Sequence, residues 1–430
     1  MAQLQSSAKG RPVQKSRTFF ILSGLFLLAL GTFSLGMISV QKNWLPWQKA
    51  QEARDILRSL RKTGKILPNR SYAPRVPAAS DVRYALHAPS AVAPGMLAIT
   101  RLDPETMRYV TDLIAADGTV LHSWPIDYSR VNADGAALEM PHGVKVLPDG
   151  SLLVGFDGVR GQARLDACGE PLWARSDAVY HHVTAADTEG YWTWRAGIWD
   201  SGHDQALLRF DAKTGETLEI IDLIDEVILS DPANALSMAI PDGFVFDREA
   251  PENGVTDIFH PNDIEPLPAA MADAFPRFSP GDLLVSLRNL NLVAVLERRT
   301  HRFLWAKHGP WVRQHDPDWQ ADGTITVFNN NVDRLRSNIV RVDPETGRAE
   351  VLFAGGGPDF DSYIMGEHQR LENGNWLIVS AMEGRVIEVT AEGAPVREYS
   401  NIINKRYNAV IANAEHLPQG FFDRMPECGG

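Results

Sequence analysis

Five histidines of this 430-residue chain stand at matching places in a repeated sequence pattern. They are His142, His182, His260, His315 and His368. The first, second and fourth of them open an apolar stretch, and an acidic residue and a glycine follow seven and eight residues later. In the last stretch, Asn373-Gly374 comes two residues sooner, and in the third an insertion separates the two apolar segments. Residues that recur at one place in such repeats are expected to meet in the folded chain.

A ring of imidazoles can serve three chemistries. It can bind a metal, it can line a neutral binding funnel, or one imidazole can attack a substrate while the others stabilise a transferred anion. Metal sites usually add carboxylates or cysteines, and the sequence has no HxH or HxxxH pair. The alternative is structural, with each histidine at the start of a strand satisfying a loop carbonyl.

Arg288 favours the covalent chemistry. It lies in "LLVSLRNLN", at the end of the second strand of the His260 repeat, where a hairpin returns toward the histidines. Its planar guanidinium suits the paired oxygens of a sulfuryl or phosphoryl group. A surface or loop arginine is the alternative.

The elements that must position these residues repeat every 40 to 55 residues or so, with four strands in each unit, which predicts an all-β, six-bladed β-propeller. The units begin near Gly95, His142, His182, His260, His315 and His368. The first unit lacks a histidine strand, and Tyr407 to Pro418 is expected to supply it and close the ring. The stretch "LIDEVILSDPANALSMAIPD" predicts a short helical insertion.

One N-terminal segment differs from the rest of the chain. Phe19 to Val40 has 22 residues and no charge, and basic residues precede it. It is expected to be an uncleaved membrane anchor with the N-terminus cytoplasmic and the propeller periplasmic; a cleaved signal peptide is the rival. The predicted parts are a basic tail (1–18), a transmembrane helix (19–40), a helical stalk at Trp47 to Lys65 with a Pro-rich linker (41–93), and the catalytic propeller (94–430).

Charge and cysteine content set two further bounds. A formal charge of −12 and a pI of about 5.5 argue against a nucleic-acid partner. Cys168 and Cys428 are the two cysteines, and in an exported chain they could form one bridge or remain two thiols.

Three segments, taken in order, resemble a known family. They are "MPHGVKVLPDGSLLV", "FHPNDIEPL" followed by "GDLLVSLRN", and "QHDPDWQADGTITVFNNN". The sequence resembles the bacterial arylsulfate sulfotransferases over residues 95 to 400. That resemblance implies sulfuryl transfer from a phenolic sulfate ester to a hydroxyl acceptor, without a nucleotide donor, through a sulfohistidine.

The same resemblance implies roles for four residues. His315 matches the nucleophile, His142 and His260 match supporting histidines, and Arg288 matches the arginine that holds the sulfuryl oxygens. We therefore expect a small aryl sulfate donor, no cofactor and no metal. The chain departs from the family in its anchor, in "FNNN" where Asp-Asn-Gly is frequent, and in its insertions.

Two other functions remain open at this point. One is a non-enzymatic, membrane-tethered propeller that acts as a binding or assembly scaffold, because fold alone does not define function. The other is a metal-dependent hydrolase of sulfate esters, which needs an ion held by carboxylates. Convergence of His142, His260, His315 and Arg288 on one point would favour the transferase.

Overall fold

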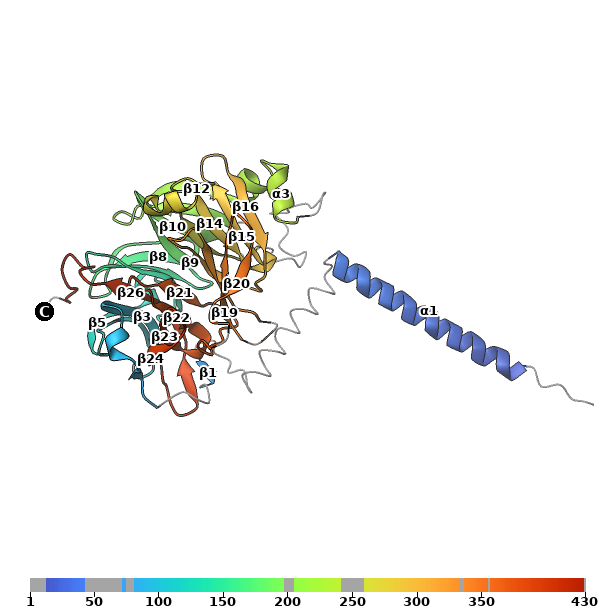
Figure 1. Ribbon diagram of the computed structural model, residues 1–430, viewed down its shortest axis with the longest axis horizontal. Helices are drawn as coiled ribbons and strands as arrows, with labels where there is room; N and C mark the ends of the chain where they lie inside the picture. Colours follow the sequence, from blue (N-terminus) through green and yellow to red (C-terminus); the bar gives the residue numbers. More distant parts are fainter. Residues whose placement is uncertain are drawn as a thin grey trace, which may run out of the picture. The chain divides into compact units, whose positions relative to one another are not determined.

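The computed structural model describes residues 13–42, 72–74, 81–196, 205–240, 259–332, 334, 336–354 and 356–428. The chain divides into two units, Met1–Arg58 and Ser59–Gly430. In the first unit, α1 (Val13–Gln41) is drawn as the long blue helix of Figure 1. Its stretch Phe20–Val40 is long and apolar enough to cross a membrane, a property that signal sequences share. The helix expected at 47–65 lies outside the described residues.

The second unit is all-β and propeller-like, with four sheets of four or five strands as separate blades among the described residues. The first contains β26 (Ile411–Pro418), β3 (Gly95–Asp103), β4 (Arg108–Ile114) and β5 (Val120–Ile126); another contains β13 (Pro261–Pro266), β14 (Leu283–Leu287), β15 (Leu292–Glu297) and β16 (Arg302–His308). The third contains β17 (His315–Trp319), β18 (Ile325–Asn329), β19 (Asn338–Val342) and β20 (Ala349–Val351); the last contains β21 (Glu367–Arg370), β22 (Trp376–Ser380), β23 (Arg385–Val389), β24 (Pro395–Ser400) and β2 (Tyr84–Leu86).

A seven-stranded sheet joins what the sequence presents as two repeats. It contains β6 (Pro141–Val146), β7 (Leu152–Phe156), β8 (Arg160–Leu165), β9 (Pro171–Asp187), β10 (Gly190–Ala196), β11 (Gln205–Phe210) and β12 (Thr217–Asp222). The sheet is continuous because β9 is 17 residues long. The first part of β9 pairs with β8, and its last part pairs with β10.

The remaining elements are short. They are η1 (Pro89–Ala91), η2 (Tyr128–Arg130), η3 (Leu223–Ile228), α3 (Pro232–Ser237), η5 (Ala269–Ala274), η6 (Arg288–Leu290), η7 (Ala381–Glu383), and the paired strands β1 (Tyr72–Pro74) and β25 (Tyr407–Ala409). The predicted helical insertion is confirmed, because η3 and α3 occupy it. Upstream of residue 94, where we expected linker, β2 pairs with β24 and covers an edge of the last sheet.

The local sequence explains the hairpins. The glycines of the repeated turns, Gly150, Gly323 and Gly374, have φ values of 83°, 82° and 87°, a region that favours glycine. The strands that follow these turns, β7, β18 and β22, are buried at all five residues, as is β14. Apolar runs without alternation are typical of strands covered on both faces. Each such strand therefore packs against a sheet on either side.

The hydrophobic core is correspondingly divided into clusters between neighbouring sheets. Leu113 of β4 packs with Leu152 of β7 in one cluster, and Val293 of β15 packs with Val327 of β18 in another. The sheets therefore contact one another around a ring.

Strand β26 completes the first sheet, as predicted. It pairs antiparallel with β3, from Ile411 opposite Arg101 to Pro418 opposite Gly95. Figure 1 shows this red strand beside the blue β3. Because β3 would otherwise be an open sheet edge, the pairing both closes the ring and covers that edge.

A disulfide bond joins the segment after β26 to a turn of the seven-stranded sheet. Cys168, in the turn between β8 and β9, is bonded to Cys428, which follows β26, across a sequence separation of 260 residues. The possibility left open by the sequence is thus resolved in favour of one bridge. The bond fastens the segment after the closing strand to the seven-stranded sheet.

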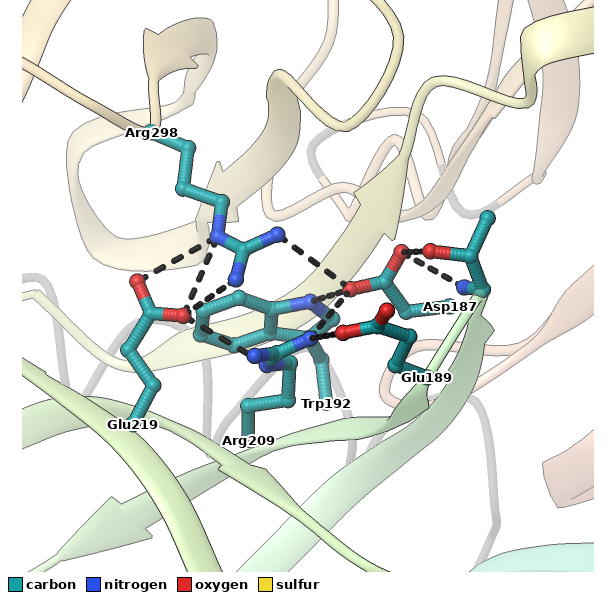
Figure 2. Close-up of polar contacts among 7 residues, drawn as sticks. Asp187, Glu189, Trp192, Arg209, Glu219 and Arg298 are labelled. Carbon is teal, nitrogen blue, oxygen red and sulfur yellow. Dashed lines mark hydrogen bonds and ion pairs between the residues drawn. The ribbon is translucent and has the colours of Figure 1, made fainter.

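An ion cluster ties the seven-stranded sheet to the next one. Figure 2 shows Arg298, from the turn between β15 and β16, between the carboxylates of Glu219 and Asp187. The Arg298 guanidinium lies 5.4 Å from the Trp192 ring centroid, and the indole N–H donates to Asp187 at 3.2 Å. Arg298 is therefore held by two anions and an aromatic face at once.

We expect Arg298→Met to lower the free energy of unfolding by about 1.5 to 3 kcal/mol, because two carboxylates lose a shared, partly buried cation. Urea unfolding followed by tryptophan fluorescence measures this. The control is Arg299→Met on the same turn, where the side chain is 81% exposed and pairs with Glu297. That variant should change stability by less than about 0.5 kcal/mol. An equal loss in both variants would contradict the role given to Arg298.

Candidate active site

The channel between the innermost strands holds a cavity of about 250 Å³. Residues of β6, β9, β13, β17, β21 and β26 line it. Of the five repeated histidines, His142, His182, His315 and His368 are lining residues, and His260 reaches the group through His182. The structure thus brings the repeated histidines together around one channel.

Irregular backbone at the start of the inner strands turns these side chains. His182, His260 and Asp316 have positive φ values of 68°, 44° and 50°, and Gly143 has 79°. The strand register shifts beside three of these residues, between His142 and Lys145, between Pro261 and Asp263, and between His315 and Pro317. A bulge re-aims side chains and is frequent next to functional sites.

Three histidines form a continuous chain. His142 Nε2 lies 2.6 Å from His182 Nδ1, and His182 Nε2 lies 3.3 Å from His260 Nε2. A neutral imidazole has one donor and one acceptor nitrogen, so this chain can run in either direction. The family resemblance gives His182 no role. The structure places it between His142 and His260, with its ring centroid 6.0 Å from that of His315.

Asn330 determines the tautomer of His315. Both hydrogens of its amide nitrogen have carbonyl acceptors, Ser362 O and Met365 O, each at 2.7 Å. Its Oδ1 must therefore accept the 2.7 Å hydrogen bond from His315 Nδ1. The proton of neutral His315 is consequently on Nδ1, and Nε2 carries the lone pair. The backbone N–H of Met365 donates a hydrogen bond to Nε2, with 3.3 Å between the two nitrogens.

Burial and neighbouring charge keep the His315 imidazole neutral. Burial lowers the pKa of His315 well below its usual value, and the positive charge of Arg288 lowers it further. Burial also lowers the pKa of His142. Neutral His315 retains its Nε2 lone pair, which a nucleophile requires.

Arg288 lies at the same end of the channel. It begins η6 directly after β14, and its backbone N–H donates to His260 O at 3.1 Å. The predicted return of the hairpin to this end is therefore observed. Arg288 is not among the lining residues of the cavity, and its effect on the pKa of His315 places its charge within electrostatic reach of that imidazole.

A group of carboxyl side chains shares the cavity with the histidines. We call Asp263, Glu265, Asp316, Asp318 and Glu367 the acidic tier. Two of these residues are spaced two apart on β13 and two on β17, and all four line the cavity. Imidazoles therefore line one part of the cavity, and carboxyl groups line the adjacent strand segments.

The carboxyls of this tier raise one another's pKa. Burial raises the pKa of Glu265 to about 7 and that of Glu367 to about 8, and the charge of Asp316 adds to both. Burial and neighbouring carboxylates also hold the pKa of Asp263 and Asp318 well above the usual value. Several of these groups therefore retain protons near neutral pH.

Two further contacts organise the tier. Lys145 bonds to Glu415 at 2.6 Å, and this carboxylate raises the pKa of the lysine. His368 bonds through Nδ1 to Asp316 at 2.8 Å and through Nε2 to the Thr326 hydroxyl at 2.7 Å. His368 is thus a buried residue that orients a carboxylate.

The sequence reading missed Asn330 and the acidic tier. Asn330 was visible as part of "FNNN", but its role depends on carbonyls of a distant loop. The carboxyls had a local signal in the alternating acids of "NDIEP" and "HDPDW", at the start of two inner strands. Alternation of acids on a channel-facing strand would have indicated them.

A family model described as "Arylsulfotransferase (ASST)" matches residues 143–402. No curated protein matches the sequence.

Several solved structures are similar at low identity. A protein of unknown function from Bacteroides caccae has a TM-score of 0.48 at 12% identity, with 75% of this chain and 98% of that one covered. An inactive virginiamycin B lyase from Staphylococcus aureus, with quinupristin, has a TM-score of 0.36 at 12% identity, with 60% and 69% covered. At these TM-scores neither indicates the chemistry of this chain.

We expect His315 to remain neutral at about pH 6, where an ordinary histidine with a pKa near 6.5 is mostly charged. In chelator-treated protein, its ¹⁵N NMR shifts should show a protonated Nδ1 and an unprotonated Nε2 from about pH 8 to pH 6. The resonance is assigned by its loss in His315→Asn.

The lowered pKa of His315 also predicts how the stability of the protein depends on pH. Below a pH of about 6.5 the unfolded chain binds a proton at His315 that the folded chain does not. As the pH is lowered through this range, the free energy of unfolding should therefore decrease more steeply in the native protein than in His315→Asn. Titration of His315 at the ordinary pKa would refute both expectations.

Proposed function

The chain belongs to the arylsulfotransferase family, and from this premise we propose that it transfers a sulfuryl group from a phenolic sulfate ester to a phenol or another hydroxyl acceptor. The observation that carries the proposal is His315, a buried neutral imidazole whose proton is held on Nδ1 by Asn330. This leaves Nε2 as the nucleophile.

In the first half-reaction, His315 Nε2 forms a bond to sulfur while the bond between sulfur and the aryl oxygen breaks. The aryl oxygen leaves with the electron pair and needs a proton, because phenols have a pKa near 10. The imidazolium-like product keeps its Nδ1 proton, and Asn330 Oδ1 accepts that hydrogen bond throughout. The positive charge formed on the ring is thereby stabilised.

The chain of His142, His182 and His260 handles the leaving group's proton. We assign proton donation to His142 or His260 and a linking role to His182. The donor enters this step as an imidazolium, because a neutral imidazole has no proton acidic enough to give to a phenolate. The 2.6 Å and 3.3 Å contacts support this, because a proton released at one end can be replaced from the other. When a second phenol takes the sulfuryl group, the chain accepts its proton.

Arg288 is the group that we assign to the sulfuryl oxygens. Its guanidinium can donate two parallel hydrogen bonds, and the charge on those oxygens spreads as the S–O bond breaks. The electrostatic coupling between Arg288 and His315 supports this position. Two half-reactions at one site imply ping-pong kinetics.

We also propose that the body has six blades, with the seven-stranded sheet acting as two that share β9. A hydrophobic cluster supports this count, because it joins Leu153 of β7 to Leu208 of β11. Side chains on two strands of one flat sheet separated by three intervening strands would not meet. The sheet therefore folds over at β9.

The location we propose is the bacterial inner membrane, with the N-terminus cytoplasmic and the body periplasmic. The apolar stretch Phe20–Val40 of α1 supports an anchor. The disulfide between Cys168 and Cys428 supports export, because such bonds persist in oxidising compartments.

Replacing the nucleophile tests the mechanism. His315→Asn should lower both donor cleavage and transfer by at least about a thousandfold, because asparagine cannot form the covalent intermediate. Mass spectrometry of native protein incubated with an aryl sulfate should show a sulfuryl mass on the peptide that contains His315. The digest is kept alkaline, since the adduct is expected to be acid-labile.

Arg288→Lys is the contrasting variant. It keeps the charge but loses the paired donors, so the rate should fall by about a hundredfold while the adduct still forms. Retained turnover in His315→Asn would show that the histidine is structural and would overturn the assignment.

A protease experiment tests the location. Protease added to intact spheroplasts should digest the body and leave the α1 region protected, because the basic residues before α1 favour a cytoplasmic N-terminus. A cytoplasmic marker protein is the control for lysis. A body that survives until the membrane is dissolved would contradict the proposed orientation.

A further inference from the structure

The lining of the cavity contains more carboxyl side chains than lysines and arginines. Six carboxyl side chains line the cavity, namely the five of the tier and Glu415. Among the described lining residues, Lys145 is the single lysine or arginine, and it is bonded to Glu415 at 2.6 Å. The five carboxyl groups of the tier are therefore not paired with a lysine or arginine among the described lining residues.

Two of these carboxyls converge with a histidine. Oxygens of Asp316 and Asp318 and a ring nitrogen of His368 lie within 4.8 Å of one another. His368 is already bonded to Asp316 and to Thr326, and its Nε2 is 3.7 Å from Asp318. The imidazole thus orients the carboxylate of Asp316 and leaves carboxylate oxygens as the donors toward the cavity. Carboxylates that bind metals are commonly oriented by such a contact.

Asp263 supplies an independent observation. It comes from β13, the neighbouring inner strand, and its side chain lines the same cavity. It is 3% exposed, and its Oδ2 has no hydrogen-bond partner. A buried carboxylate oxygen without a partner is strongly unfavourable, and coordination to a metal is one of the ways in which proteins satisfy it.

We propose that a divalent metal cation binds in the channel at Asp316 and Asp318, with His368 holding Asp316 in place and Asp263 of the neighbouring strand as a further oxygen donor. All three donors are carboxylates, which select hard cations such as Ca²⁺, Mg²⁺ and Mn²⁺ over thiolate-preferring metals. Glu265, two residues after Asp263 on the same face of β13, is the nearest additional oxygen donor along the strand.

The cation site is independent of sulfuryl transfer. It uses the acidic tier, whereas the proposed transfer uses His142, His260, His315 and Arg288. A bound dication would place positive charge beside a channel that must admit an anionic sulfate ester, and so would offset the repulsion between that ester and the tier. Failure of the transferase assignment would leave the cation site standing.

Mn²⁺ binding to the detergent-solubilised full chain tests the proposal. After chelator treatment, loss of the free Mn²⁺ signal in electron paramagnetic resonance should show one saturable site per chain, and Ca²⁺ should compete for it. Asp263→Asn and Asp318→Asn should each weaken Mn²⁺ binding at least about tenfold, because a carboxylate donor becomes a neutral amide.

Asp322→Asn is the matched control. Asp322 follows Asp318 in the exposed turn after β17, where it bonds to Thr324, and its replacement should leave Mn²⁺ affinity unchanged. His315→Asn should likewise leave it unchanged, which separates this site from the transfer chemistry. Circular dichroism checks that each variant is folded.

A measurement on the native chain covers the case in which the variants do not fold. Bound Mn²⁺ should broaden the imidazole resonances of His315 and His368 far more than those of the exposed His308. Absence of saturable Mn²⁺ binding to the native chain would overturn the proposal and show that the carboxyls share protons instead. Equal broadening of all three histidines, or equal weakening by Asp322→Asn, would also overturn it.

Discussion

The pairing of β26 with β3 is the constraint on which the rest of the molecule depends. It adds a strand from near the C-terminal end of the described residues to the inner edge of the first sheet, next to β3. One hydrophobic cluster depends on this directly, because it contains Ile411 of β26, Leu97 of β3 and Leu377 of β22. Closure also forces the inner strands toward one axis. Polar side chains on their inner faces must then bond to one another, because few other partners are within reach.

The histidines and the acidic tier are two results of that convergence. Where backbone bulges turn the side chains inward, imidazoles meet, and burial lowers the pKa values of His142 and His315. Further along these strands, acids spaced two apart line the same cavity, and burial and neighbouring carboxylates raise the pKa values of Asp263 and Asp318. Imidazoles and a cluster of carboxyl groups therefore line a single cavity of about 250 Å³.

The sequence predicted the features that repeat. Turn glycines, apolar second strands and histidines recur in the same order from repeat to repeat, so the propeller-like fold, the closing strand and the meeting of the histidines followed from local pattern. It could not predict features that depend on one particular contact. Asn330 sets the tautomer of His315 through carbonyls 32 and 35 residues away. The linking position of His182 depends on the length of β9, which merges two repeats and is not visible in the turn signals.

The disulfide bond changes how the closing strand can come away from its sheet. A strand held at one end only can peel off, breaking its hydrogen bonds one after another from the loose end. Here β26 is preceded by β25, which pairs with β1, and is followed by Cys428, which is covalently joined to the seven-stranded sheet. With both flanks fastened, stepwise fraying is blocked, and β26 can leave only when two neighbouring sheets loosen together. Opening of the ring is therefore a collective event rather than a local one, and the channel should be among the last regions to exchange its amide hydrogens.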